Sequence, residues 1–266
     1  MMTSKERILA ALRCEPVDRV PCDPWFFGSY VAALGRQLPA RELLHYLTRE
    51  LGADEFGVPT VAHVGMGLTL LIQLMGGQRA AIASIEEPEL VERFLDVEHA
   101  TNLAMIEVYL KAGVDIICRN GFYETCDFWS PRQVKEFVLP RVNAEARFTH
   151  SLGGLLTYTV CTGIEPLLDL YVESEIDCIQ KFETKLTGQT LAPIARKLGG
   201  RKCLWGGLSD CVDLGQATPD ETRDAVRAAF DLVGRRGFIL AASPSVKSQR
   251  PVENVQAMFE AWRESC

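Results

Sequence analysis

The sequence predicts a single (β/α)8 barrel that spans residues 1–266 as one domain. Three observations favour this fold class. Eight short apolar runs have the length of buried strands, and most of them are separated by segments with a helical apolar period. The 266 residues are also close to the roughly 250 that such a barrel takes. A doubly wound open sheet is the alternative, although no GxGxxG motif follows the early strands.

The predicted strands show little strict alternation, which is typical of parallel strands that are covered on both faces. They are residues 20–23, 55–58, 60–64, 114–119, 155–161, 176–180, 202–207 and 237–242. In a barrel of this kind the chemistry takes place where the strands end and the following loops begin. Side chains just after these runs are therefore the first candidates for a functional site.

Three capping boxes, at Thr3–Glu6, Ser130–Gln133 and Thr218–Glu221, predict helix starts. In each, a hydroxyl accepts from a free N–H, and the side chain three residues later accepts from the cap residue. Pro131 and Pro219 occupy first helical positions, where a missing N–H costs nothing. The predicted helices are residues 4–13, 88–112, 131–150, 164–174, 190–198, 219–233 and 251–265.

Composition and charge exclude several classes of binding partner and cellular location. With 28 Lys and Arg against 35 Asp and Glu, the chain is acidic, and we expect no nucleic-acid partner. The longest apolar stretch, residues 66–75, is far shorter than the roughly 20 residues of a membrane span, so we expect no membrane partner. The N-terminus has no signal-peptide pattern, and the nine cysteines contain no CxxC pair. We therefore expect reduced cysteines and a cytoplasmic location.

Segments along nearly the whole chain resemble one family in order. They are SKERILAALRCEPVDRVPCDPW, GMGLTLLIQLMGG, AGVDII with SPRQVKEFVLPRV, TGIEPLLDLYVESEIDCIQKFE, LWGGLSD with TPDETRDAV, and GFILAASPSVKSQRPVENVQAMFEA. On these segments the chain resembles the uroporphyrinogen decarboxylase superfamily, whose members are (β/α)8 barrels. The members include haem-pathway decarboxylases. They also include methyltransferases that exchange methyl groups between cobalamin proteins and thiols, or move them from methoxylated aromatics to cobalamin.

Departures from the family pattern bear on its chemistry. Relatives run well beyond 300 residues and carry a long insertion over the barrel mouth, whereas residues 56–64 leave that loop truncated. The decarboxylases have an Arg-rich loop after the first strand. In this chain the corresponding segment reads PWFFGSY, and no arginine lies between the end of the first predicted strand and Arg36. The family's conserved Tyr falls near Gln73 and its C-terminal His at or beside Pro244. The resemblance therefore implies that uroporphyrinogen is a poor substrate.

The thiol-specific methyltransferases of the family use zinc to generate a thiolate. Their His-x-Cys ligand pair aligns with TVC at residues 159–161, and their last ligand, a Cys, aligns with SPS at residues 243–245. One of the three ligands is retained. The resemblance implies that the zinc site is lost or rebuilt from other residues, and Cys161 and His63 are the candidate metal ligands.

Three residues are the candidate catalytic groups. Cys161 falls where the family's metal Cys falls, His63 ends a predicted strand, and Glu124 lies in the loop after residues 114–119. Each has a structural alternative: a small buried apolar side chain for Cys161, a hydrogen-bonded pocket imidazole for His63, and a solvated loop for Glu124.

A further set of side chains near strand ends is expected to bind substrate. These residues are Trp25, Phe27, Tyr123, Asp127, Glu183, Asp210 and Ser245. The aromatic pair has loop packing as its alternative, and Glu183 and Asp210 have the capping of helix starts as theirs.

The resemblance implies a corrinoid-linked methyltransferase with a small-molecule substrate, a corrinoid protein as partner and co-substrate, and a homodimeric assembly. Displacement at a methyl carbon needs positioning more than a proton relay. Two alternatives stay open. One is a carboxy-lyase like uroporphyrinogen decarboxylase, acting on a tetrapyrrole or another carboxylate. The other is a non-catalytic barrel that binds a ligand or a partner.

Overall fold

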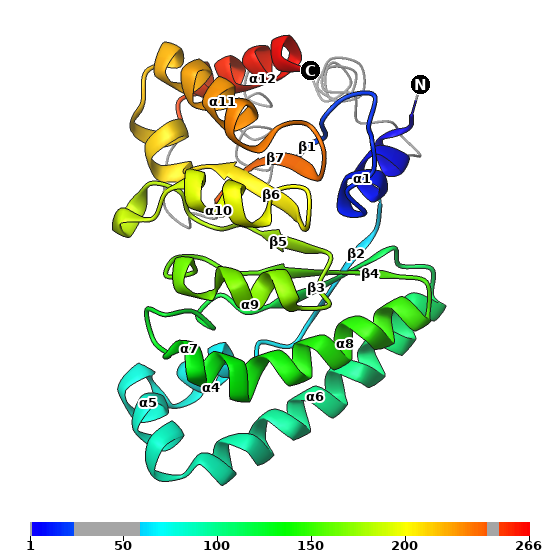
Figure 1. The fold of residues 1–266 in the computed structure, drawn as a ribbon, viewed down its shortest axis with the longest axis vertical. Coiled ribbons are helices and arrows are strands. Elements are labelled where there is room, and N and C mark those ends of the chain that lie inside the picture. Colours follow the sequence, from blue (N-terminus) through cyan, green and yellow to red (C-terminus); the bar gives the residue numbers. More distant parts are fainter. Residues whose placement is uncertain (1, 24–58, 244–249) are drawn as a thin grey trace, which may run out of the picture. The chain divides into compact units, whose positions relative to one another are not determined.

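The computed structural model describes residues 2–23, 59–243 and 250–266. The chain divides into two compact units. The middle unit is Thr60–Phe182, and the terminal unit combines Met1–Pro59 with Glu183–Cys266. Each unit contains parallel strands and the helices that connect them (Figure 1). The predicted strand at residues 55–58 lies outside the described residues, and the other seven predicted strands are confirmed.

Four strands of the middle unit pair in parallel and in chain order. They are β2 (Val61–Val64), β3 (Ile116–Asn120), β4 (Leu155–Thr159) and β5 (Cys178–Gln180). The register sets His63 beside Cys118, and it sets Thr159 between Asn120 and Gln180. Because side chains alternate along a strand, residues paired in register project from the same face of the sheet.

The helices of the middle unit lie between these strands in the sequence. They are α4 (Leu68–Met75), α5 (Gly77–Glu86), α6 (Pro88–Lys111), α7 (Pro131–Gln133), the π-helix η2 (Val134–Val138), α8 (Leu139–Ser151), the 3-10 helix η3 (Glu165–Leu167) and α9 (Leu168–Glu173). Figure 1 shows α6 and α8 lying side by side, in line with the contacts between them. The sequence pattern predicted neither α4 nor α5, because Gly76, at a φ of 85°, separates two short helices.

One predicted helix is not uniform. Residues 131–150 were expected as one α-helix, but the π-helix η2 interrupts it ahead of Pro140. Proline has no N–H to donate to a carbonyl one turn earlier, so the regular α pattern cannot continue through this point. The capping box at Ser130 and Gln133 is confirmed, with Ser130 Oγ accepting from the Gln133 N–H at 3.2 Å.

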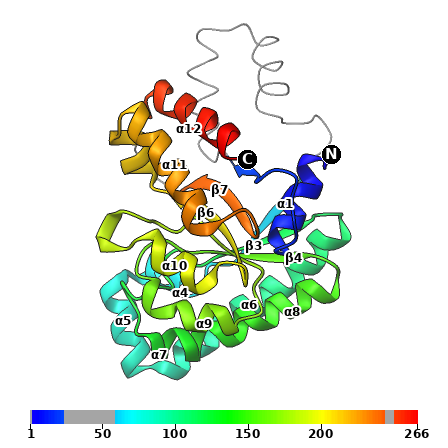
Figure 2. The same cartoon turned by 45° about the horizontal axis from the view of Figure 1, so that its top comes forward.

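The terminal unit has three parallel strands in the order β1–β7–β6. Its elements are α1 (Ser4–Leu12), β1 (Cys22–Asp23), the 3-10 helix η4 (Leu186–Gly188), α10 (Leu191–Leu198), β6 (Cys203–Leu208), the π-helix η5 (Asp210–Gln216), α11 (Pro219–Val233), β7 (Phe238–Ala242) and α12 (Val252–Ser265). Figure 2 shows α11 and α12 side by side. The Arg223–Glu260 pair, at 2.9 Å, links their outer faces.

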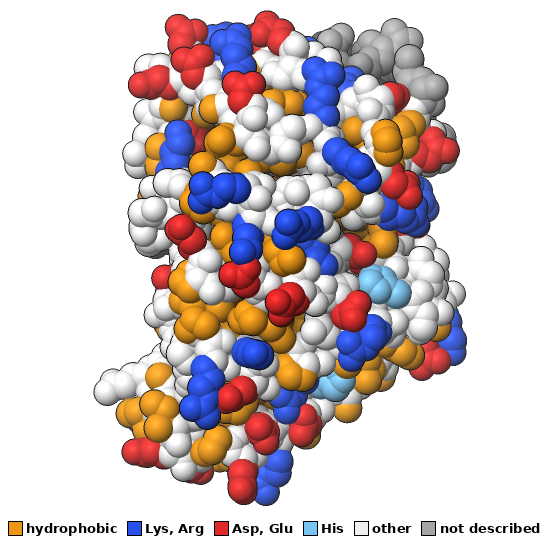
Figure 3. Space-filling model, in the orientation of Figure 1, with side chains coloured by type: hydrophobic (Ala, Val, Ile, Leu, Met, Phe, Trp, Pro, Cys, Tyr) orange, Lys and Arg blue, Asp and Glu red, His pale blue; other side chains and the backbone are white. Residues whose placement is uncertain are grey.

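The capping boxes at Thr3–Glu6 and Thr218–Glu221 are also confirmed. Strands β6 and β7 are buried along their whole length, as expected for parallel strands covered on both faces. On the face shown in Figure 3, basic and acidic side chains are interspersed rather than gathered by sign. Among the described helices, none is by itself long and apolar enough to span a membrane; α4 and α5 together meet that test, but a bend of 118° separates them.

Candidate functional site

The two faces of the middle-unit strands differ in chemistry. One face carries fully buried apolar side chains such as Ile117, Leu156 and Ile179. We name the opposite face the polar face and define it by six of its polar or ionisable side chains. They are His63, Cys118, Asn120, Thr157, Thr159 and Gln180. All six lie within two residues of a strand's carboxyl end, where sites form in parallel α/β folds.

Hydrogen bonds connect the buried part of the polar face. Gln180 Nε2 lies 2.7 Å from Cys118 Sγ and 2.8 Å from Thr157 Oγ1, and it donates to both. Thr157 Oγ1 in turn donates to the Ile117 carbonyl at 3.3 Å, so its own proton is committed. Thr159 Oγ1 lies 3.3 Å from the same Cys118 sulfur. Polar groups from β4 and β5 therefore converge on one sulfur of β3.

His63 is the solvent-exposed member of this face. Its Nδ1 lies 3.3 Å from Asn120 Oδ1, and Asn120 Nδ2 donates to the Val64 carbonyl at 3.4 Å, which orients the amide. Hydrogen bonding with the Cys118 thiol raises the pKa of His63 above its ordinary value, although partial burial opposes the shift. The contact with Asn120 adds to the rise, and the charge of Lys181 acts against it.

Cys118 is 1% exposed. Burial acts to raise the pKa of its thiol, but hydrogen bonds with His63 and Thr159 and the charge of Lys181 outweigh burial and leave that pKa below its ordinary value. Sequence reasoning missed both Cys118 and Lys181. Cys118 lies inside the apolar run of residues 114–119, and Lys181, which is buried with a φ of 62°, directly follows β5. A strand-end position was the one available signal for Lys181.

Glu124 lies in a different environment, on the helix-covered side of β3. Its side chain is fully buried and accepts from the Leu68 N–H at 2.8 Å and from the Tyr158 hydroxyl at 2.6 Å. Arg119 Nη2 lies 3.4 Å from the same carboxylate. A Cβ at Gly67 would lie 1.9 Å from Glu124 Oε1, so this approach of α4 requires glycine.

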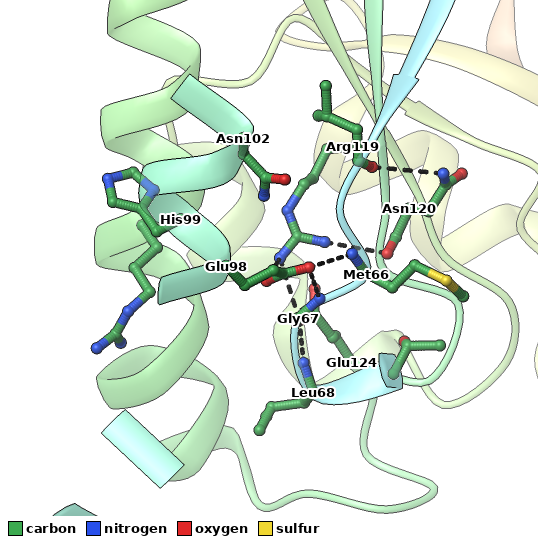
Figure 4. Close-up of polar contacts among 12 residues, drawn as sticks. Met66, Gly67, Leu68, Glu98, His99, Asn102, Arg119, Asn120 and Glu124 are labelled. Carbon is green, nitrogen blue, oxygen red and sulfur yellow. Dashed lines mark hydrogen bonds and ion pairs between the residues drawn. The ribbon is translucent and has the colours of Figure 1, made fainter. Parts of the chain in front are cut away.

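Arg119 is the centre of a buried charge cluster (Figure 4). Its Nε lies 3.0 Å from Glu145 Oε2, and its Nη2 lies 3.7 Å from Glu98 Oε2. Glu98 Oε1 also accepts from the N–H groups of Met66 and Gly67, which begin the turn into α4. Three carboxylates thus share one guanidinium, and the cluster joins β3 to α6, α8 and the start of α4.

The two most buried acids of this cluster differ in pKa. Burial raises the pKa of Glu124, and the opposing effects of Arg119 and Tyr158 do not cancel it. Burial acts in the same direction on Glu145, but Arg119 and the hydrogen bond from His99 outweigh it, so that pKa is lowered. The Glu124 side chain is therefore tied to Arg119, Tyr158 and α4, an arrangement that stabilises the fold.

The loops after β3 and β4 hold three further predicted residues. Cys161 is half-buried, two residues past the end of β4. Asp127 is exposed and accepts a hydrogen bond from the Thr162 hydroxyl, which ties the two loops together. Tyr123 is exposed and packs against Phe128, with ring centroids 5.2 Å apart. Across residues 2–23, 59–243 and 250–266, no group of three or more His, Cys, Asp or Glu side chains is placed to hold a metal ion.

The predicted residues of the terminal unit have structural partners. Glu183 Oε1 accepts from the N–H groups of Thr184 and Lys185, both at 2.8 Å, and Glu183 Oε2 accepts from the Ser243 hydroxyl at 2.6 Å. Asp210 is fully buried and forms a two-point ion pair with Arg250. Trp25, Phe27 and Ser245 lie outside the described residues.

The donor set does not fit the zinc site of the thiol-specific relatives. Thr159 replaces the first ligand, and its hydroxyl lies against Cys118 Sγ at 3.3 Å. Ser243, the first residue of the segment aligned with the last ligand, donates to Glu183. Of the aligned positions that the structure describes, Cys161 alone is a cysteine, and a zinc ion needs at least three protein ligands. We derive no reaction step through zinc.

The described strands and their strand-end polar face define a parallel α/β scaffold of the barrel class. Residues 34–265 match the family described as "Uroporphyrinogen decarboxylase (URO-D)", and the chain belongs to this family. No curated protein matches the sequence. A solved methyltransferase from Methanosarcina mazei shares the fold, with a TM-score of 0.75 and 17% identity over 99% of both chains. The predicted (β/α)8 fold of the uroporphyrinogen decarboxylase type is thereby confirmed.

A more distant likeness was also found. A B12-independent methionine synthase from Shewanella sp. W3-18-1 aligns with 78% of this chain and 63% of its own, with a TM-score of 0.49 and 15% identity.

Proposed function

We propose that this protein is a methyltransferase that moves a methyl group between a small methylated substrate or thiol and a corrinoid carried by a partner protein. The observation that carries the proposal is the polar face of β2–β5. Its exposed end presents the His63 imidazole, with Lys181 close by, and the six side chains that form the face include no carboxylate. The fold shared with the Methanosarcina methyltransferase supports it.

Displacement at a methyl carbon requires alignment of donor and acceptor, and stabilisation of the charge that develops on the leaving atom. It does not require a carboxylate base beside the reacting carbon. His63 can stabilise developing negative charge, and Asn120 Oδ1, 3.3 Å from its Nδ1, fixes the orientation of the ring. The polar face thus suits methyl displacement better than a reaction that begins with proton abstraction by a carboxylate.

The corrinoid enters this proposal as a co-substrate. It supplies the nucleophile or the methyl group, and the chain's own residues bind and orient the small substrate. Tyr123 and Asp127 stay our predictions for substrate contacts, because both are exposed on the loop that follows β3. Cys161 stays a prediction for a contact at the end of β4, where it is half-buried.

The test combines purified protein with reduced cobalamin and a panel of methoxylated aromatics, methylated amines and methylated thiols. Methyl transfer is followed by the change in corrinoid absorbance, and in the reverse direction with methylcobalamin and free thiols. We expect turnover that falls at least tenfold in His63→Gln, while Glu136→Gln, at an exposed position on η2, serves as the matched control. Turnover of a porphyrinogen, detected by product fluorescence, without methyl transfer would instead support the carboxy-lyase alternative.

A further inference from the structure

The buried thiol of Cys118, beside His63 in the sheet, has no part in the proposed function as stated above. We propose that Cys118 and His63 form a thiolate–imidazolium pair in which Cys118 positions and charges the ring, and His63 donates its proton to the leaving oxygen of a methoxylated donor. This inference rests on the proposed function and deepens it, because it assigns the groups that supply the proton when a methoxylated compound, a donor class already known in the family, is the substrate.

Two of the polar contacts around the sulfur favour its charged form, whereas in the third the Cys118 thiol donates to Asn120 Oδ1 at 3.7 Å. Gln180 Nε2 donates to Cys118 Sγ at 2.7 Å, and that amide is held in place by its second bond, at 2.8 Å, to Thr157 Oγ1. Thr159 Oγ1, at 3.3 Å, can donate its proton to the sulfur as well. Donors that converge on one acceptor stabilise a negative charge there.

The charges around the pair point the same way. The ionisable groups that face His63 from neighbouring described elements are Cys118 on β3 and Lys181 after β5. Asn120, the third group that faces His63, is neutral. Since the six polar-face side chains include no carboxylate, the sulfur is the counter-ion that this face offers to the imidazolium. The opposite pKa shifts of His63 and Cys118 agree with this assignment.

The difference in burial between Cys118 and His63 indicates which of the two meets the substrate. Cys118 is 1% exposed, with β4 and β5 side chains packed against its sulfur, so a substrate does not reach it. His63 is exposed and lies beside it in register on β2. The imidazolium is therefore the member that meets the substrate, and Cys118 acts through it as a positioning residue.

The proton on His63 indicates which class of methyl donor the site would use. An ether oxygen leaves as a phenolate or alkoxide, which is a poor leaving group unless it takes a proton. In the proposed step the acceptor nucleophile bonds to the methyl carbon as the carbon–oxygen bond breaks. The electron pair stays on the oxygen, which takes the proton of His63, and His63 regains a proton from water. Transfer thus runs from the methoxylated compound to the reduced corrinoid.

The first experiment follows the protonation of His63 by NMR without any methyl donor. The chain has four histidines, so the His63 signal is assigned by its loss in His63→Gln. We expect wild-type His63 to titrate above its ordinary pKa, and to titrate lower in Cys118→Ser and in Cys118→Ala. Cys203→Ser, a matched change at a fully buried cysteine of β6, should leave His63 unchanged. A wild-type His63 that titrates at or below the ordinary value overturns the pairing, whether or not the variants fold.

The second experiment compares two donors with reduced cobalamin as acceptor. One is a methoxylated phenol, and the other is a trimethylsulfonium salt, whose neutral thioether leaves without a proton. We expect His63→Gln and Cys118→Ser to lose 10²- to 10⁴-fold in kcat with the methoxylated phenol, and far less with the sulfonium. Equal losses with both donors would mean that the pair is structural, and would overturn the proton-transfer role.

Failure of the proposed function gives a different result, namely no methyl transfer by the wild type with either donor. That result overturns the proton-transfer role, and the NMR titration then decides the thiolate–imidazolium pair by itself.

Discussion

Replacing Arg119 with methionine tests the buried charge cluster of the middle unit. The guanidinium lies 3.0 Å from Glu145 and 3.4 Å from Glu124, and its side chain is 3% exposed. At 3.4 Å and an effective dielectric constant near 20, one such pair attracts by about 5 kcal/mol before the cost of burying the charges is subtracted. Removing one partner leaves the carboxylates buried without a counter-ion, so we expect Arg119→Met to lose about 3–5 kcal/mol.

Two changes at Glu124 sharpen the same test. Glu124→Gln keeps an acceptor for the Leu68 N–H and offers the Tyr158 hydroxyl a donor, and it removes a carboxylate whose pKa burial already raises. We therefore expect Glu124→Gln to cost only about 1–2 kcal/mol. Glu124→Ala leaves these donors and Arg119 without a partner, and should cost about 3–5 kcal/mol.

The assay is urea unfolding followed by circular dichroism, with Glu136→Gln as the control. Glu136 pairs with Arg132 at an exposed position, where the loss of an ion pair costs at most about 1 kcal/mol. A near wild-type midpoint for Arg119→Met would refute the charge-cluster argument. So would a Glu124→Gln variant that unfolds as readily as Arg119→Met.

Three further predictions follow from single contacts. Because the pKa of His63 is raised in the folded state, protonation of this ring stabilises the fold. That stability is fully present below the ordinary histidine pKa of about 6.5, and it is lost as the pH rises through the folded-state pKa. The difference in unfolding free energy between wild type and His63→Gln should therefore shrink with rising pH, as measured by urea unfolding at pH 5–9. Thr218→Ala removes an N-cap that accepts from the Glu221 N–H and should lower the free energy of unfolding by about 1 kcal/mol, measured by thermal melts. Gly163→Ala puts a Cβ within 2.7 Å of Asp127 at a φ of 66°. It should cost more than the roughly 1 kcal/mol expected at an open position of positive φ such as Gly153, and equal losses at the two positions would count against the clash.

Local patterns were enough to locate most elements. The three capping boxes and the proline positions identify helix starts, because the interactions that begin a helix lie within four residues of one another. Apolar runs identify the strands for a similar reason. The exceptions are informative: α4 and α5 were missed, and η2 interrupts a predicted helix, because a glycine and a proline changed the local backbone.

The candidate site contains some residues that the sequence identified and others that it did not. His63 was identified because it ends a strand. Cys118, in contrast, has the sequence surroundings of a core cysteine, and its partners come from residues 41 and 62 positions further along the chain. Strand register brings these groups together, and no pattern in any one segment encodes it.

The sequence by itself determined the fold class, the family and the order of strands and helices, since these follow from short-range periodicity and from motifs spread along the chain. Tertiary structure alone decided that Glu124 joins a buried charge cluster while Cys118 lies beside His63. Both Arg119 and Cys118 are buried on β3, and the alternation of the strand sends one toward α6 and α8 and the other to the polar face. The role of each ionisable side chain depends on its neighbours in space, and the pairing of strands β2, β3, β4 and β5 brings those neighbours together.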